Sequence, residues 1–212
     1  MATLKVAIVH VTPFEQNCSI VWDDDTKKAA IVDPGGDLPR IQGAIADLKV
    51  IPEKILLTHG HIDHAGGAAE LAALLSIPIE GSHEADAPLL ANLTAQGERF
   101  GMAGVRPVKP TRWLNEGDTV TVGGLVFDVL HVPGHAPGHV VFVHAPSEFA
   151  LVGDTIFQGS VGRTDLPGGD HELLIRGIKE KILPLGDDFT VLPGHGPATT
   201  LERERKTNPF LQ

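Results

Sequence analysis

The sequence predicts one α/β domain in which two β-sheets pack face to face and helices cover their outer sides. Two observations lead to this prediction. Short β-rich runs precede helical segments, and this order occurs twice along the chain. The chain has 212 residues, of which 42% are hydrophobic and 21% charged, which fits one domain over residues 1–212 with a sizeable core.

In the first half of the chain, three β-rich runs are followed by a helix, a further strand and a second helix. The first helix places Ile41, Ile45 and Leu48 on one buried face, because they recur at helical spacing. The second helix is expected over residues 65–75. The strands expected in this half are residues 6–9, 20–22, 29–32 and 54–57.

The second half repeats this order after a middle segment, residues 82–112, which is expected to be helical and then broken by prolines. Helix returns at residues 170–183, and Thr199 with Glu202 predicts a capping box at the start of a last, charged helix. The strands expected here are residues 119–122, 125–130, 140–143, 149–152 and 189–192.

Charge and composition exclude several classes of protein. Asp and Glu number 27 against 17 Lys and Arg, a net charge of −10, so a nucleic-acid binder is not expected. The one cysteine, Cys18, precludes an intrachain disulfide and is expected in the core. Residues 1–14 lack a signal-peptide pattern, and no run approaches the roughly 18 apolar residues of a membrane span. The expected location is therefore the cytoplasm, without a membrane partner.

The histidines indicate metal chemistry. The chain holds 11 His and no Tyr, and imidazole is the commonest metal ligand in proteins. Four candidate ligands fall close together where the strand at 54–57 ends and a helix begins: His59, His61, Asp63 and His64. Such a corner can direct His59 and His61 one way and Asp63 and His64 another, which suits two adjacent ions. Imidazole and carboxylate ligands without thiolate fit zinc, iron or manganese.

Three further candidate ligands follow predicted strands later in the chain. His135 and His195 each stand in a Pro-Gly-His sequence, and Asp154 follows a buried run that ends in glycine. One Pro-Gly-His sequence alone is usually a turn. Three candidates in series with the first cluster indicate a metal site.

In this order, these residues resemble the motifs of the metallo-β-lactamase superfamily. Those motifs are an early aspartate, here Asp33, then H-x-H-x-D-H, and then His, Asp and His. The resemblance covers nearly the whole chain and implies a four-layer αββα sandwich with two metal ions at one edge of the sheets. By this likeness one ion takes His59, His61 and His135, the other takes Asp63, His64 and His195, and Asp154 bridges them.

Residues around the ligands have expected supporting roles. Asp33 is expected to orient a ligand imidazole through a hydrogen bond, and His139 to act likewise. The expected cofactors are two divalent ions, with zinc favoured and iron or manganese as alternatives. Structural or surface roles are expected for His10, His83, His131, His144 and His171.

The sequence flanking the motifs narrows the resemblance to the short hydroxyacylglutathione hydrolases (type II glyoxalase II). The segments that carry it are residues 16–18, 33–37, 57–61, 133–135, 162–165 and 208–211. The resemblance implies a thioester hydrolase that converts an S-lactoylglutathione-type substrate to a hydroxy acid and glutathione. Its partner is therefore a small molecule, and the oligomeric state is left open.

Two adjacent metal ions explain the expected chemistry. Ions about 3.5–4 Å apart share a water and lower its pKa from 15.7 towards about 7. A thioester suits this hydroxide, because a leaving thiolate whose thiol has a pKa of about 8.5 needs little protonation. An amide leaving group needs a proton donor, either Asp63 or water. Asp63 and the bridging Asp154 are the expected catalytic residues.

A Gly-rich loop after Asp154 holds two candidate substrate-binding residues, Arg163 and Asp165. Arg163 either clasps a glutathione carboxylate with two hydrogen bonds or pairs with Asp165 to hold the loop. The sequence leaves both interpretations open.

Other functions fit the sequence less well. The alternative enzyme is a mononuclear iron persulfide dioxygenase acting on glutathione persulfide, which would use His59, His135 and Asp154. The complete second ligand set, including His195, favours the hydrolase. Lactam hydrolysis is disfavoured by the missing export signal and nuclease activity by the charge. A non-catalytic binding module would not need two metals.

Overall fold

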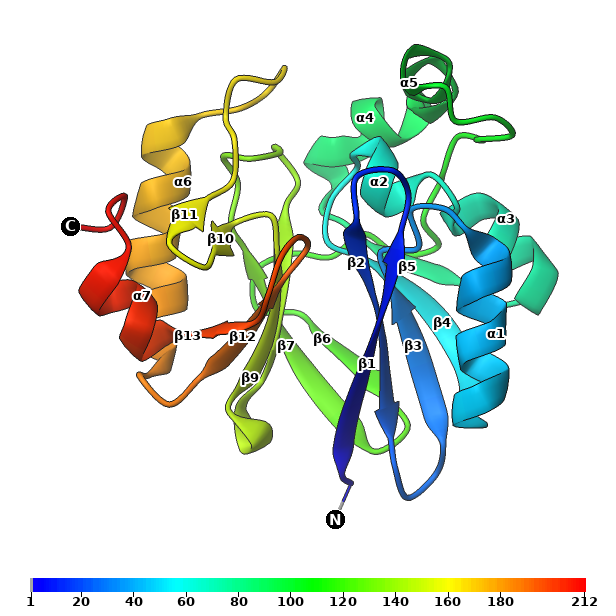
Figure 1. Cartoon of the computed structure of the whole chain (residues 1–212), viewed down its shortest axis with the longest axis horizontal. Coiled ribbons are helices and arrows are strands. Elements are labelled where there is room, and N and C mark those ends of the chain that lie inside the picture. Colours follow the sequence, from blue (N-terminus) through cyan, green and yellow to red (C-terminus); the bar gives the residue numbers. More distant parts are fainter. Residues whose placement is uncertain (1) are drawn as a thin grey trace.

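Two β-sheets pack face to face in the computed structural model, which describes residues 2–212 (Figure 1). The first sheet has the strand order β1-β2-β3-β4-β5 and the second β13-β12-β9-β8-β7-β6. The first comprises β1 (Leu4–Val11), β2 (Gln16–Asp23), β3 (Lys28–Val32), β4 (Ile51–Leu57) and β5 (Ile79–Gly81). The second comprises β6 (Thr119–Val122), β7 (Leu125–His131), β8 (Val140–His144), β9 (Phe149–Gly153), β12 (Thr190–Pro193) and β13 (Thr199–Thr200). A small hairpin adds β10 (Ile156–Phe157) and β11 (Ser160–Val161).

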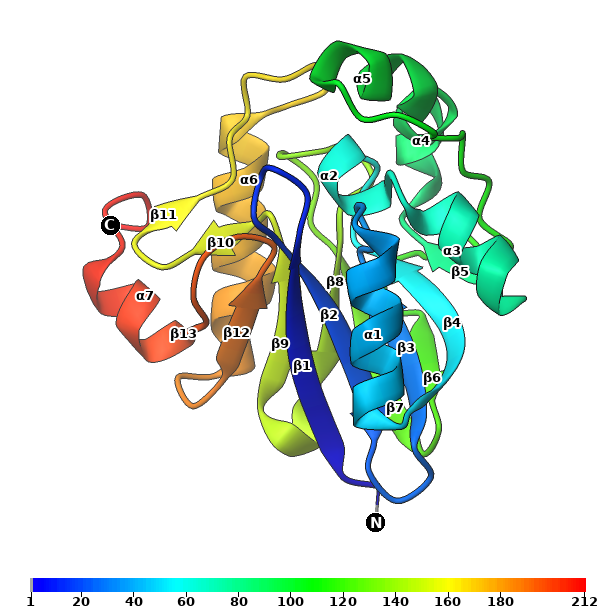
Figure 2. The same ribbon diagram turned by 45° about the vertical axis from the view of Figure 1, so that its right-hand side comes forward.

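Helices cover the outer faces of both sheets. Figures 1 and 2 show α1 and α3 beside the first sheet and α6 and α7 beside the second. The α-helices are α1 (Leu38–Leu48), α2 (Ile62–Ala65), α3 (Ala68–Leu75), α4 (Ala87–Ala91), α5 (Leu93–Phe100), α6 (His171–Gly177) and α7 (Leu201–Thr207). The chain after α6 continues as a π-helical segment, Ile178–Ile182, and a 3₁₀ turn, Leu183–Leu185. Within residues 2–212, every helix is too short or too polar to cross a membrane.

Three apolar layers hold these elements together. Ile31 of β3 packs with Ile41 of α1 in one outer layer, whereas the next residue, Val32, faces the second sheet. On the second sheet, Phe142 faces inward and its neighbour Val141 packs in the other outer layer. Because successive side chains point to opposite faces of a strand, each sheet contributes to two layers. The fold is therefore the αββα sandwich that the sequence predicts.

The strands follow the sequence-based expectations closely. All nine expected strands coincide with or overlap observed strands, and Cys18 is fully buried in the outer layer of the first sheet. The four strands not foreseen are β5, β10, β11 and β13, which have two or three residues each. Such short runs carry too little alternation to be recognised in a sequence.

The helix expected over residues 65–75 is wrong in its extent, because the chain forms two helices, α2 and α3, in this region. The N–H of Gly67 donates to the Pro34 carbonyl at 2.9 Å rather than to a carbonyl one turn earlier in its own helix. This bond ties the interrupted segment to the loop that follows β3.

The predicted capping box at Thr199 and Glu202 is displaced by one residue. Thr200 is the N-cap of α7, and its hydroxyl accepts the Arg203 N–H at 3.3 Å. The Thr199 hydroxyl instead donates to the buried Glu204 carboxylate at 2.6 Å. A tertiary contact thus takes the residue that the local pattern assigned to the cap.

Thr200→Ala should lower the free energy of unfolding by about 1 kcal/mol, since it removes the cap of α7. Glu202→Gln should cost less, because Glu202 is exposed and its ion pair with Lys206 lies on the helix surface. Urea unfolding followed by circular dichroism measures both. A loss for Thr200→Ala no larger than that for Glu202→Gln would contradict the assignment of Thr200 as the cap.

Candidate metal centre

The seven predicted ligands converge at one edge of the two sheets. His59 follows β4, His135 follows β7, Asp154 follows β9 and His195 follows β12. Strands β7 and β9 are each antiparallel to β8, and β12 is parallel to β9, so all three run in the same direction. Their carboxyl ends lie beside α2, which carries Asp63 and its neighbour His64 (Figures 1 and 2).

Three buried histidines form a first group, the tri-histidine group. His135 Nε2 lies 3.3 Å from His59 Nε2 and 3.0 Å from His61 Nδ1. The three ligand atoms all lie within 4.8 Å of one another. Burial lowers the pKa of each imidazole, that of His61 to about 3. The rings are therefore neutral and have nitrogen lone pairs available for a cation.

Asp63, His64 and His195 form a second group, the mixed group, whose ligand atoms also lie within 4.8 Å of one another. Asp63 Oδ2 lies 3.1 Å from His195 Nε2 and 3.7 Å from His64 Nε2. Burial would lower the pKa of both histidines, but the Asp63 and Asp154 carboxylates outweigh it and raise both pKa values. The group therefore stabilises positive charge.

Asp154 lies between the two groups. Its Oδ2 is 3.5 Å from His135 Nε2 and 3.6 Å from His195 Nε2, and its Oδ1 is 3.4 Å from His64 Nε2. Burial would raise the pKa of this carboxyl, but the positive charge of His64 outweighs burial and holds the pKa well below the ordinary value. One ionised carboxylate thus faces both sets of nitrogens.

Buried polar atoms without partners indicate that cations belong here. Among residues 2–212, His64 Nε2 and Asp154 Oδ1 are buried and lack a hydrogen-bond partner. A Cβ at Gly194 would lie 2.2 Å from Asp154 Oδ1, so only glycine lets the backbone close this wall. Leaving such atoms unpaired is costly, and divalent ions bound by the two groups would satisfy them. Their imidazole and carboxylate donors fit zinc, iron or manganese.

Asp33 orients two of the imidazoles from outside the centre. Its Oδ2 accepts from His64 Nδ1 at 2.9 Å and from the Thr58 hydroxyl at 2.6 Å, and its Oδ1 accepts the Thr58 N–H at 2.7 Å. With its proton committed to Asp33, the Thr58 hydroxyl accepts from His59 Nδ1 at 3.0 Å. These bonds leave the Nε2 atoms of His59 and His64 unprotonated and directed inward when the rings are neutral.

Backbone carbonyls orient two more imidazoles. His135 Nδ1 donates to the Arg163 carbonyl at 2.8 Å, and His195 Nδ1 donates to the Phe14 carbonyl at 3.1 Å. These two hydrogen bonds hold the loop after β11 and the turn between β1 and β2 against the candidate metal centre.

His139 lies beside the centre but binds a backbone group. Its Nε2 accepts the Asp154 N–H at 3.0 Å, and its ring stacks on His59 with centroids 4.8 Å apart. Burial lowers the pKa of His139 well below its ordinary value, so this nitrogen is a lone-pair acceptor. The contact holds the backbone of Asp154, the residue that lies between the two groups.

Asn17 is a site residue whose role was not assigned from the sequence. Its Nδ2 donates to the carbonyls of Pro193 at 3.0 Å and Gly196 at 2.8 Å, which flank His195. The adjacent Gln16 places Nε2 3.4 Å from His64 Nδ1. The only sequence signal was their place among the motif-flanking segments, because the contacts of Asn17 span more than 170 residues of chain.

Arg163 and Asp165 form an exposed, bidentate ion pair. Arg163 Nε and Nη2 each lie 2.8 Å from an Asp165 carboxylate oxygen, and the two side chains are 61% and 67% exposed. The Arg163 carbonyl holds His135, so the pair lies in a loop that touches the centre. The structure thus shows the loop-holding pair, and a substrate-binding role stays a prediction.

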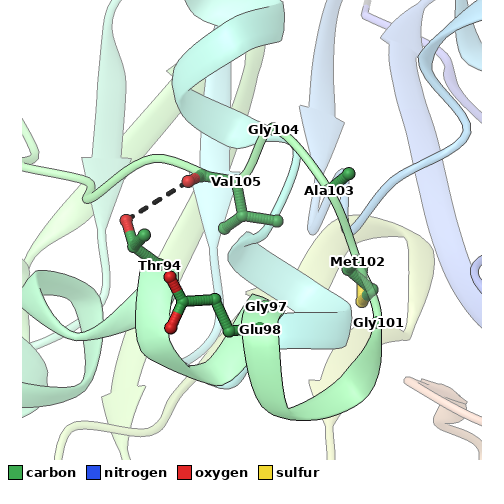
Figure 3. Close-up of a pocket in the computed structure, with 8 residues that line it drawn as sticks. All are labelled: Thr94, Gly97, Glu98, Gly101, Met102, Ala103, Gly104 and Val105. Atoms are coloured by element: carbon green, nitrogen blue, oxygen red, sulfur yellow. Dashed lines mark hydrogen bonds between the residues drawn. The ribbon is translucent and has the colours of Figure 1, made fainter.

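A pocket of about 380 Å³ lies away from these groups, between α5 and residues 101–105 (Figure 3). The Thr94 hydroxyl donates to the Val105 carbonyl in its wall at 3.2 Å, and Glu98 is its charged lining residue. None of the seven predicted ligands lines this pocket. The chemistry is therefore assigned to the sheet edge rather than to this hollow.

Asp154→Ala should reduce metal binding in both groups, because its carboxylate faces both, whereas His195→Ala should reduce it in the mixed group alone. Elemental analysis of purified protein after dialysis against metal-free buffer gives the stoichiometry of each variant. Full and equal occupancy of the two variants would contradict the assignment of the ligands.

Known proteins share this architecture. Residues 11–195 match the profile of the metallo-beta-lactamase superfamily. Hydroxyacylglutathione hydrolase GloC of Haemophilus influenzae is 45% identical across 98% of both chains, and the probable metallo-hydrolase YqgX of Bacillus subtilis is 37% identical across 98% of both. Among solved structures, the BLEG-1 B3 metallo-beta-lactamase superposes with a TM-score of 0.89 at 37% identity, covering 98% of this chain and 99% of its own. A di-iron-bound form of TTHA1623 has a TM-score of 0.88 at 38% identity, covering 97% and 100%. The chain belongs to the metallo-β-lactamase superfamily.

Proposed function

We propose that the protein hydrolyses a glutathione thioester of the S-lactoylglutathione type, releasing the hydroxy acid and glutathione. The observation that carries this proposal is the complete mixed group facing the tri-histidine group across Asp154. Two complete groups suit a two-metal hydrolase, whereas a one-iron dioxygenase uses a single set of ligands. The name of the 45% identical relative, hydroxyacylglutathione hydrolase, supports the substrate class.

The cofactors we propose are two divalent ions, held by the tri-histidine group and the mixed group with Asp154 between them. When bound there, such ions supply a water that is acidic near neutral pH and a Lewis acid for the substrate carbonyl. Zinc is the proposed metal. Iron is the alternative, since the related TTHA1623 has been solved with two irons.

The protein itself supplies charge and proton transfer. Burial would raise the pKa of Asp63, but the charge of His64 and the hydrogen bond from His195 outweigh it and lower the pKa. The Asp63 carboxylate is therefore ionised and able to accept the proton of the attacking water. We assign this proton transfer to Asp63 and the alignment of the two groups to Asp154.

The leaving group favours a thioester over an amide. Glutathione leaves as a thiolate, whose thiol has a pKa of about 8.5, so expulsion needs little protonation. A β-lactam is the second candidate substrate, because BLEG-1, 37% identical to this chain, is a metallo-beta-lactamase by name. An amine leaving group must be protonated, and either Asp63 or water would supply the proton.

The zinc-loaded protein should consume S-lactoylglutathione under strictly anaerobic conditions, because hydrolysis needs water and no oxygen. Loss of the thioester absorbance measures the rate. Oxygen uptake with glutathione persulfide, together with no anaerobic hydrolysis, would assign the protein to the dioxygenases instead. Turnover of a β-lactam without thioester turnover would assign it to the lactamases.

Arg163 is proposed to exchange Asp165 for a glutathione carboxylate when substrate binds. Arg163→Ala should then raise KM for S-lactoylglutathione with little change in kcat, because the lost contact is made equally in the ground state and the transition state. Asp165→Asn is the matched control and should not raise KM, since it frees the guanidinium. Unchanged KM with a lower melting temperature would instead assign the pair to loop stability.

A further inference from the structure

A buried carboxylate outside the ligand set joins two ligand-bearing loops. Asp86 is fully buried at the end of the short 3₁₀ turn Glu84–Asp86. Its Oδ2 accepts the N–H of Gly60 at 2.8 Å, and its Oδ1 accepts the N–H of Gly138 at 2.5 Å. Gly60 stands between His59 and His61, and Gly138 lies in the loop that carries His135. One side chain therefore connects the backbones that present the entire tri-histidine group.

The carboxylate of Asp86 is held by further contacts around it. The Ser82 hydroxyl donates to Asp86 Oδ2 at 3.1 Å, and the His83 N–H donates to the Gly138 carbonyl at 3.0 Å. A Cβ at Gly138 would lie 2.6 Å from Asp86 Cγ, so the loop and the turn are in close contact. The bonds of Asp86 span 26 and 52 residues of chain.

The chemistry of this position requires two acceptor oxygens. Both loops offer a backbone N–H, and a carboxylate accepts from both with charge-assisted bonds. Burial raises the pKa of Asp86 to about 6, although the three donors act to lower it, so holding the ionised form here is costly. An asparagine would accept from one loop and direct its NH₂ group against the donor of the other.

The mixed group is held by other contacts. His64 Nδ1 donates to Asp33, and His195 Nδ1 donates to the Phe14 carbonyl. The loop that carries His195 is also held by the hydrogen bond from Asn17 Nδ2 to the Pro193 carbonyl. None of these bonds passes through Asp86. Asp33 supports both groups, through His64 and through Thr58 to His59, whereas, of the two groups, the Asp86 carboxylate binds only the loops of the tri-histidine group. A change at Asp86 therefore acts on the tri-histidine group and leaves the contacts of the mixed group in place.

We propose that Asp86 is a positioning residue for the tri-histidine group, setting the separation of the loop of His59 and His61 from the loop of His135. The proposal rests on metal binding at the proposed centre and does not depend on which substrate is hydrolysed. Because the three nitrogens come from two loops, a change in the spacing of these loops alters the fit to a cation without touching any ligand.

Zinc affinity in two backgrounds tests this role. His195→Ala leaves the tri-histidine group as the complete set, and His61→Ala leaves the mixed group. Competition of Zn²⁺ with a chromophoric chelator gives the dissociation constant of the remaining site. Asp86→Asn should raise that constant about tenfold or more in the His195→Ala background, the effect typical of losing a residue that orients ligands. It should leave the constant in the His61→Ala background unchanged.

Asp23→Asn is the matched control. Asp23 is also a buried carboxylate, accepting N–H groups of Gly124 at 2.9 Å and Asp25 at 3.1 Å, but it lies at the other end of the sheets. The Asp23→Asn substitution should lower the melting temperature without changing the affinity for zinc. If Asp86→Asn does not fold, Ser82→Ala loosens the same carboxylate more gently and should give a smaller rise in the His195→Ala background alone.

Equal losses in both backgrounds, or unchanged affinity in the His195→Ala background, would overturn the proposal. A wild-type chain that binds no Zn²⁺ would overturn the metal centre and this proposal together. Absent thioester turnover in a protein with the expected zinc affinities would overturn the proposed function and leave the role of Asp86 intact.

Discussion

The structure is organised around imidazole nitrogens and carboxylate oxygens that can bind a cation and that face one another at one edge of the sheets. His59 Nε2 and His135 Nε2 lie 3.3 Å apart, and the hydrogen bonds on their Nδ1 atoms leave lone pairs on both sides of this contact. Two facing lone pairs make no hydrogen bond, and both rings are removed from water. The surrounding chain therefore has to hold these nitrogens close together in a buried place, where a bound cation would accept their lone pairs.

The outer contacts supply that support from several parts of the chain. Asp33 binds His64 directly and His59 through Thr58, and backbone carbonyls bind His135 and His195. Each bond fixes both the direction of a ring and the nitrogen that carries its proton. The ligands are thus preorganised by groups that themselves take no part in binding the metal.

Charge is distributed unevenly between the two groups. The tri-histidine group contains neutral rings, because burial is the main cause that lowers their pKa values. The mixed group includes a carboxylate and stabilises positive charge. Asp154, ionised and in contact with both, is the electrostatic link between them. This arrangement agrees with a centre that binds two cations and keeps a carboxylate available for proton transfer.

Local patterns in the sequence determined much of this protein. β-Rich runs between turn residues predicted the nine main strands, and their repeated order before helical segments predicted two packed sheets with helices outside. The spacing of His59, His61, Asp63 and His64 predicted a metal centre at this corner, because three imidazoles and a carboxylate within six residues are typical of metal ligands. These features depend on neighbouring residues alone.

The tertiary structure decided what depends on contacts between distant segments. Thr199, predicted to cap a helix, instead donates a hydrogen bond to the buried Glu204. The helix expected over residues 65–75 is interrupted at Gly67, whose N–H donates to the Pro34 carbonyl. The role of Asp86 had no local signature, because its partners lie 26 and 52 residues away. A hydrogen bond across such separations depends on how distant segments pack together, so no spacing rule within one segment predicts it.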